Sequence, residues 1–328
     1  MSSHGSKLEL ARVVMALRRI WWTAAVLAFV AGAVVCGQEA PQQPTFRSGV
    51  DLVTVRAVVR DGRGRPVTHL QRQDFTLIDR GVARPIASFD QDPGPVGLAL
   101  LFDVSGSMDV ATKLERAREA SYFLLSKLRS GTDEAAIYAF DSRLHLVQPF
   151  TTNIDGLRGR LSDVEPWGVT SLHDAIAAAA ESVGTQEARR RALVVLTDGI
   201  DTSSRLSAPE VSRIASAIDV PVYVMAIVSP IDLQDAEGRR DIRSDATRQG
   251  SLADLARWTG GQLFASTSSA QSSQAAQRII DELRTQYLLA FEPGPQSGWH
   301  PLEVRVRNKD YVVQARSGYV AGQFRPSS

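Results

Sequence analysis

Residues 97–108 constrain the fold more than any other part of the chain. An unbroken apolar run, Gly-Leu-Ala-Leu-Leu-Phe, is followed directly by Asp-Val-Ser-Gly-Ser-Met. A strand that is apolar on both faces is typical of the centre of a parallel sheet. In an open α/β sheet, ligands usually bind at the carboxyl ends of such strands. Asp103, Ser105 and Ser107 place a carboxylate and two hydroxyl groups at that end, so they are candidate ligand-binding residues.

The first 37 residues predict an export signal or an N-terminal membrane anchor. An uncharged apolar run at residues 20–35 is preceded by basic residues and followed by small ones, which is the pattern of a signal peptide. The basic residues are Arg12, Arg18 and Arg19. The pattern favours cleavage after Ala33 or Gly37. The alternative is an uncleaved anchor that attaches residues 12–37 to a membrane, because the apolar run is almost long enough to span one. We therefore expect a secreted, periplasmic or envelope-associated protein.

The length, charge and cysteine content of the chain limit the kinds of protein that it can be. A chain of 328 residues can form two domains of ordinary size. Its net charge of +1 gives no indication of nucleic acid as a partner. The single cysteine, Cys36, precedes the second predicted cleavage point, so cleavage there would leave a mature chain without disulfides.

The pattern of elements changes twice along the chain, from β to α/β and back to β. Each β segment alone offers too few strands for an independent core, which favours a single β-sandwich interrupted by the α/β domain. The expected segments are 1–37 (signal or anchor), 38–47 (linker), 48–94 (first part of the sandwich), 95–286 (α/β domain), 287–322 (second part of the sandwich) and 323–328 (tail).

Within residues 95–286, buried strands alternate with amphipathic helices, which predicts a doubly wound, mostly parallel sheet. The expected strands are 97–102, 135–140, 192–197, 221–228 and 262–264, and the expected helices are near 114–128, 172–183, 209–218, 252–258 and 275–284. One helical face is formed by Leu114, Ala117, Ser121, Leu124, Leu125 and Leu128.

Two further loops carry oxygen ligands. Thr170 precedes one expected helix, and Asp198 ends the strand 192–197. Should the loops meet at the switch point of the sheet, two carboxylates and three hydroxyls would surround one position. Such an all-oxygen set suits Mg²⁺, and the domain lacks the cysteines or clustered histidines that a zinc site would use. Thr197 and Asp201 are interpreted as ordinary turn residues. His173 is interpreted as a residue of the surface or of the helix start, with a side chain that faces the site as the alternative.

These three segments resemble the metal-ion-dependent adhesion site of the von Willebrand factor type A domain. The matching segments are Asp-Val-Ser-Gly-Ser (103–107), Val-Thr-Ser-Leu (169–172) and Leu-Thr-Asp-Gly (196–199). The resemblance implies that Asp103, Ser105, Ser107, Thr170 and Asp198 hold Mg²⁺, or Mn²⁺ or Ca²⁺, and that a protein partner presents a carboxylate to the ion. Family members often have Gly-Gly-Thr where this chain has Gly-Val-Thr, so Val169 is a departure. Residues 67–77 and 314–319 also resemble exported bacterial proteins frequent in acidobacteria.

Enzymatic activity is not expected. Ser105 does not lie in a Gly-x-Ser-x-Gly nucleophile elbow, and the sequence has neither a P-loop nor a dinucleotide fingerprint. Metal-assisted phosphotransfer stays open as an alternative, but a second carboxylate would be expected at the position of Ser105. Two functions are carried forward. One is a cation-dependent protein-binding or adhesion module outside the cytoplasm, and the other is a structural or assembly component in which the cation only stabilises the domain.

Overall fold

The computed structural model describes residues 52–91, 94–162, 168–185, 190–228 and 251–322. The expected signal or anchor, the linker and the tail lie outside these residues, as does Cys36. Among the helices described, none has the length and apolar character needed to span a membrane. The segment boundaries expected from the sequence remain predictions.

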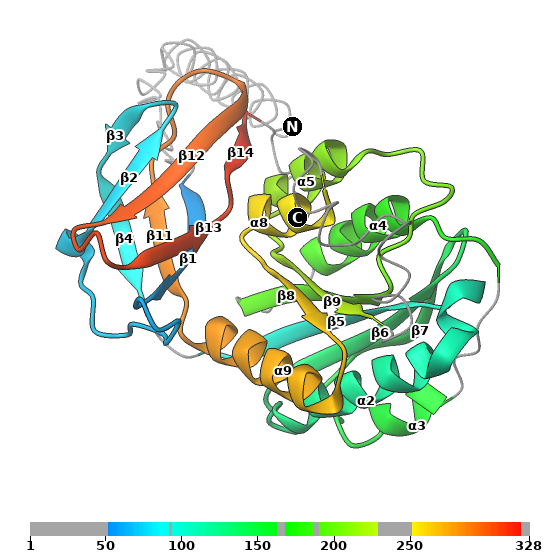
Figure 1. Ribbon diagram of the computed structural model, residues 1–328. Helices are drawn as coiled ribbons and strands as arrows, with labels where there is room; N and C mark the ends of the chain where they lie inside the picture. The colour runs from blue at the N-terminus through cyan, green and yellow to red at the C-terminus, as the bar shows by residue number, and fades with distance from the viewer. Residues whose placement is uncertain (1–51, 92–93, 163–167, 186–189, 229–250, 323–328) are drawn as a thin grey trace, which may run out of the picture. The chain divides into compact units, whose positions relative to one another are not determined.

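A six-stranded sheet organises the α/β part, in the order β10-β9-β8-β5-β6-β7 (Figure 1). The neighbours from β10 to β6 pair in parallel, and β7 pairs antiparallel with β6 at the edge. The strands are β5 (Val96–Asp103), β6 (Glu134–Phe140), β7 (Leu144–Thr151), β8 (Arg190–Thr197), β9 (Val222–Ile227) and β10 (Leu263–Ser266). The doubly wound sheet predicted from the sequence is confirmed. Its winding reverses between β5 and β8, which is where such sheets bind ligands.

Helices cover both faces of this sheet (Figure 1). One face packs against α2 (Lys113–Ser126), α3 (Leu157–Ser162) and α9 (Ser269–Arg284), and the other against α4 (Leu172–Gly184), α5 (Ala208–Ala217) and α8 (Leu252–Trp258). The helix α9 begins six residues before the expected start at 275, because Ser268 caps it by accepting a hydrogen bond from the backbone N–H of Gln271.

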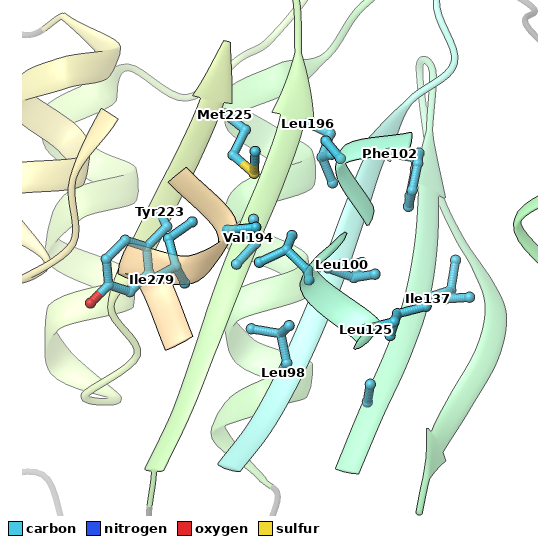
Figure 2. Close-up of a cluster of buried hydrophobic side chains, with 14 of the residues drawn as sticks. Leu98, Leu100, Phe102, Leu125, Ile137, Val194, Leu196, Tyr223, Met225 and Ile279 are labelled. Atoms are coloured by element: carbon cyan, nitrogen blue, oxygen red, sulfur yellow. The ribbon is translucent and has the colours of Figure 1, made fainter. Parts of the chain in front are cut away.

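Strand β5 is buried along its entire length because its alternate residues enter two different cores. Leu98, Leu100 and Phe102 belong to the core beneath α2 and α9, with Leu125 and Ile279 among their neighbours (Figure 2). Ala99 and Leu101 belong to the opposite core. Complete burial of such a side chain stabilises the fold by about 1.5–3 kcal/mol. The apolar run therefore places the carboxyl end of β5 firmly at the centre of the sheet edge.

The remaining strands form two four-stranded antiparallel sheets, each built from both ends of the described chain. One sheet has the order β13-β1-β11-β4 and the other β14-β12-β2-β3. Their strands are β1 (Val53–Arg60), β2 (Phe75–Asp79), β3 (Val82–Arg84), β4 (Ile86–Asp90), β11 (Tyr287–Phe291), β12 (Gly298–Val306), β13 (Val312–Ala315) and β14 (Gly318–Ala321). Thus β1 pairs with β11 and β13, and β2 pairs with β12, so the α/β segment is inserted between paired strands.

The sequence predicts strands in these sheets at residues 50–59, 75–79, 86–89, 287–291, 302–307 and 311–315. Strands β3 and β14 are additional to these, and β12 is longer than the predicted strand 302–307. It begins at Gly298 rather than at Leu302, since residues 298–301 pair with β14 and residues 302–306 pair with β2. Only the second half alternates cleanly between apolar and polar residues, which is why the sequence indicated that half alone.

Candidate metal centre

Asp103 is the last residue of β5, and both of its carboxylate oxygens are held in place. The backbone N–H of Ser105 donates to Oδ1 over 2.9 Å, and the hydroxyl of Thr197 donates to Oδ2 over 2.6 Å. Thr197 ends the neighbouring strand β8, so the parallel pairing of β5 and β8 brings it beside Asp103. Asp103 is completely buried. Its burial raises the pKa of this carboxyl to about 6, against the opposing effect of hydrogen bonds from Ser105 and Thr197.

Two hydroxyl oxygens lie next to each other just beyond this carboxylate. Ser105 Oγ and Ser107 Oγ are 3.1 Å apart, on either side of the start of the 3-10 helix η2 (Gly106–Thr112). Ligands of an octahedral Mg²⁺ lie about 2.1 Å from the ion, so adjacent ligands are about 3 Å apart. The serine spacing therefore fits two neighbouring positions around a small, hard cation.

The second loop is joined to the first through the backbone. The N–H of Gly106 donates to the carbonyl of Gly168 over 3.2 Å, and the N–H of Ser171 donates to the carbonyl of Asp141 at the end of β6. Gly168 has a φ of +88°, and a Cβ there would lie 3.1 Å from Asp141 Oδ2. A glycine is thus required at this position for two reasons. The departure at Val169 is accommodated because its side chain is exposed.

Thr170, at the end of this loop, is buried and is linked to the third loop. Its carbonyl accepts hydrogen bonds from the backbone N–H groups of Thr202 and Ser203, each over 3.0 Å. The hydroxyl of Thr202 accepts a hydrogen bond from the N–H of Thr170 over 3.1 Å. The loop that follows β8 therefore satisfies both backbone polar groups of Thr170.

Asp198 is 2 % exposed and pairs with a residue that the sequence analysis missed. The ammonium of Lys113 lies 3.1 Å from Asp198 Oδ2, and Oδ1 accepts the backbone N–H of Ile200 over 3.3 Å. Asp198 also lies near enough to Asp103 to contribute to its raised pKa. The signal available in the sequence was weak: Lys113 directly precedes Leu114, at the start of the apolar face of α2.

The three loops thus meet at the switch point between β5 and β8, as the order of strands requires. Residues 98–200, which contain all five expected ligands, match the family model of the von Willebrand factor type A domain. The α/β part of the chain contains a von Willebrand factor type A (vWA) domain.

Comparisons with individual proteins give weaker likenesses. An uncharacterised protein of Borreliella burgdorferi is 26% identical over 184 residues, which cover 51% of this chain. This chain spans about half, 52%, of the length of that relative. Among solved structures, a von Willebrand factor type A protein from Catenulispora acidiphila is 12% identical with a TM-score of 0.47, covering 84% of this chain and 76% of that one. An aerotolerance-related membrane protein from Bacteroides fragilis is 23% identical with a TM-score of 0.45, covering 57% and 98%. Neither structure is similar enough to transfer a function.

Residues around the centre of the vWA domain hold its loops together. Asp201 accepts a hydrogen bond from the N–H of Leu172, the first residue of α4, and pairs with His173 Nδ1 over 2.9 Å. Asp201 thus caps the start of α4, the helix that follows the second loop. The sequence indicated only a turn residue at this position. Thr197 likewise does more than form a turn, because it orients Asp103.

Three large apolar side chains are exposed on the loops that carry the expected ligands. Val110 lies in η2, Val169 precedes Thr170, and Ile200 follows Gly199. Their exposed fractions are 57%, 54% and 48%. We call these three residues the apolar rim. Because they belong to the loops that carry the expected ligands, these side chains are candidates for contact with a binding partner.

The donor set determines which kind of ion could be held. Within the residues described, no three side chains of histidine, cysteine, aspartate or glutamate cluster as metal ligands. A metal ion at the centre of the vWA domain would consequently depend on hydroxyl oxygens as well as on Asp103 and Asp198. Such a set suits a hard cation with oxygen preference.

Proposed function

We propose that the vWA domain is a divalent-cation-dependent protein-binding or adhesion module. Asp103, Ser105, Ser107, Thr170 and Asp198 would hold Mg²⁺, with Mn²⁺ or Ca²⁺ as alternatives. The observation that carries the proposal is the meeting of these residues' loops at one switch point, with two serine oxygens 3.1 Å apart. The bound ion would attract a negatively charged group to the coordination position that the protein leaves open, because three of its five protein ligands are neutral hydroxyl groups and only two are carboxylates.

The partner in this proposal is a protein that presents a carboxylate from an aspartate or glutamate side chain. The apolar rim supports this choice, since Val110, Val169 and Ile200 would contact apolar residues beside the acidic group. Contacts around the anchoring residue of an interface commonly exclude water from it. Nucleic acid is not a proposed partner, given the near-neutral chain.

We propose no enzymatic activity. The hydroxyl of Ser105 contacts the hydroxyl of Ser107, whereas His173 in α4 pairs with Asp201 of the third loop. A serine nucleophile would need a base within hydrogen-bond reach. The N-terminal sequence supports a secreted, periplasmic or envelope location, and residues 12–37 would attach the protein to the membrane if they are not cleaved.

A structural or assembly role is the second candidate. The backbone hydrogen bonds between Gly106 and Gly168 and between Thr170 and Thr202 already join the three loops. A cation added to such a set of loops would stabilise the domain whether or not a partner binds. The two candidates predict different results for substitutions in the apolar rim that leave the ion bound. The binding module would lose its partner, whereas the structural role predicts no such loss.

The test is capture of envelope or surface proteins by the purified chain in Mg²⁺, repeated in EDTA. Ser105→Ala should weaken Mg²⁺ binding at least about tenfold, because a hydroxyl ligand is removed. Val169→Ser should leave Mg²⁺ binding unchanged and weaken capture of the partner about tenfold, because apolar contact is lost. Calorimetry measures the ion, and surface plasmon resonance measures the captured partner.

Val82→Ser is the matched control, since Val82 is also 54% exposed but lies on β3, outside the vWA domain. It should change neither measurement. Capture that persists in EDTA and in Ser105→Ala would contradict the cation-dependent module. A lower melting temperature in EDTA, with no partner lost from any variant, would favour the structural role.

A further inference from the structure

Lys113 is a buried cation beside a carboxylate that is expected to serve a metal ion. Its side chain is 6% exposed, and its ammonium lies 3.1 Å from Oδ2 of Asp198, whose side chain is 2% exposed. The two residues are 85 positions apart in the sequence. The tertiary fold therefore brings the two residues together, and their ion pair connects the start of α2 with the end of β8.

The position of Lys113 is unfavourable on its own. Lysine is rarely buried unless it is paired, because removing an ammonium from water costs several kcal/mol. Lys113 is also the first residue of α2, where the positive end of the helix dipole disfavours a cation. The carboxylate of Asp198 offsets part of both costs, because it pairs with the ammonium.

The charges at the centre follow from these contacts. Asp103, Asp198 and Lys113 are its buried ionisable residues among those described. Two carboxylates alone would neutralise a divalent cation completely. With Lys113 beside Asp198, the same loaded centre keeps one net positive charge.

We propose that Lys113 makes the loaded centre selective for an anionic ligand, by neutralising Asp198 and so leaving the bound cation with an uncompensated positive charge. This inference rests on the proposed function. Lys113 weakens binding of the cation through like-charge repulsion and strengthens binding of a carboxylate to the loaded centre. The two effects have opposite signs, which separates this role from that of a simple structural ion pair.

The experiment uses Mn²⁺ as the ion and acetate as the carboxylate. Mn²⁺ binding to the purified chain is followed by electron paramagnetic resonance, with and without acetate, at constant ionic strength. Lys113→Met should bind Mn²⁺ about tenfold more tightly than the wild type, because a nearby positive charge is removed. Acetate should strengthen Mn²⁺ binding to the wild type, because binding of the two is linked, and should do so much less in Lys113→Met.

Lys113→Arg keeps the charge and should resemble the wild type, whereas the exposed Lys309→Met should change nothing. Circular dichroism establishes that each variant is folded, and Lys113→Gln serves as a second uncharged variant. Equal or weaker Mn²⁺ binding by folded Lys113→Met, with binding by the wild type intact, would overturn the inference alone. Failure of acetate to strengthen wild-type binding would overturn it even if both uncharged variants misfold.

The result also separates this inference from the proposed function. Absence of Mn²⁺ binding from the wild type and from both uncharged variants would overturn both proposals. Binding by Lys113→Met but not by the wild type would also overturn both, because the ammonium would then exclude the ion from the centre instead of leaving it with an uncompensated charge.

Discussion

Asp103 illustrates how neighbouring residues orient a buried carboxylate that is expected to bind a metal ion. Its side chain is completely shielded from water, and an unpaired carboxylate in that position would be very costly. The backbone N–H of Ser105 and the hydroxyl of Thr197 occupy one oxygen each, so the carboxylate is both satisfied and fixed in orientation. Partners of this kind, which hold a ligand without touching the ion, commonly influence metal affinity as strongly as some ligands do.

We therefore expect Thr197→Val to weaken Mg²⁺ binding about tenfold, with little change in the shape of the core. Valine has almost the same volume as threonine but cannot donate a hydrogen bond to Asp103 Oδ2. Calorimetric titration with Mg²⁺ measures the effect. Thr76→Val, on the exposed face of β2, is the control and should bind Mg²⁺ like the wild type. Unchanged affinity in Thr197→Val would mean that Asp103 does not depend on this hydroxyl.

At the scale of elements, the first residue of strand β5 is held by a buried aspartate. Asp133, which directly precedes β6, is completely buried and accepts the backbone N–H of Val96, the first residue of β5, over 3.0 Å. The N–H of Arg129 donates to its other oxygen over 2.7 Å, and the side chain of Arg284 in α9 does so over 3.2 Å. Burial raises the pKa of Asp133, but hydrogen bonds from Arg129 and Val96 outweigh it and lower the pKa to about 2.

The lowered pKa predicts a pH-dependent contribution to stability. Folding lowers the pKa of Asp133 from 3.8 to about 2, so the ionised form stabilises the folded state by about 2 kcal/mol. This contribution is present above about pH 4 and is lost as the pH falls through about 2. Asp133→Asn should accordingly lower the free energy of unfolding by about 2–3 kcal/mol at pH 7 and by much less at pH 2.

Urea denaturation of the wild type and Asp133→Asn across this pH range measures the difference between them. Comparing the two proteins at each pH removes the contribution of carboxyl groups that they share. The exposed Asp310→Asn is the control and should show a small, constant difference. A difference for Asp133→Asn that stays the same down to pH 2 would disprove the assigned role of its charge.

At the scale of the whole molecule, the described β strands form sheets that neither end of the chain could complete alone. Strand β1 lies between β11 and β13, and β2 lies between β12 and β3. The two groups contribute to one core, in which Val55, Ala57 and Leu77 lie with Tyr287 and Leu289. Tyr287 also donates a hydrogen bond to the carbonyl of Val67 over 2.7 Å, which joins the two ends across 220 residues.

Deletion of residues 287–322 should therefore unfold residues 52–91 while the sheet of the vWA domain persists. Strand β1 would lose both neighbours, and a lone pair such as β2 and β3 is at best marginally stable. Hydrogen exchange read by mass spectrometry should show amides of β1 and β2 exchanging at least about 100-fold faster, with β5 and β8 still protected. Continued protection of β1 in the shortened chain would show that the first β segment folds independently.

The sequence by itself determined the central strands of the vWA domain and the oxygen-bearing residues at their ends. Each of these features is local: the apolar run of β5 buries both faces and stops at Asp103, and that of β8 stops at Asp198. Val169 is also a local departure, and the exposed position of its side chain explains why the loop tolerates it.

Only the tertiary structure decided which distant residues meet. Thr197 donates to Asp103 across 94 positions, and Lys113 reaches Asp198 across 85, so neither pairing leaves a pattern in a short window of sequence. The short strand β14 forms by pairing with the first residues of β12, about twenty positions earlier in the chain. The physical reason is the same in each case. The alternation of apolar and polar residues can be read within a few positions, whereas a hydrogen bond or ion pair between distant residues forms only when the strands and helices are arranged in the fold.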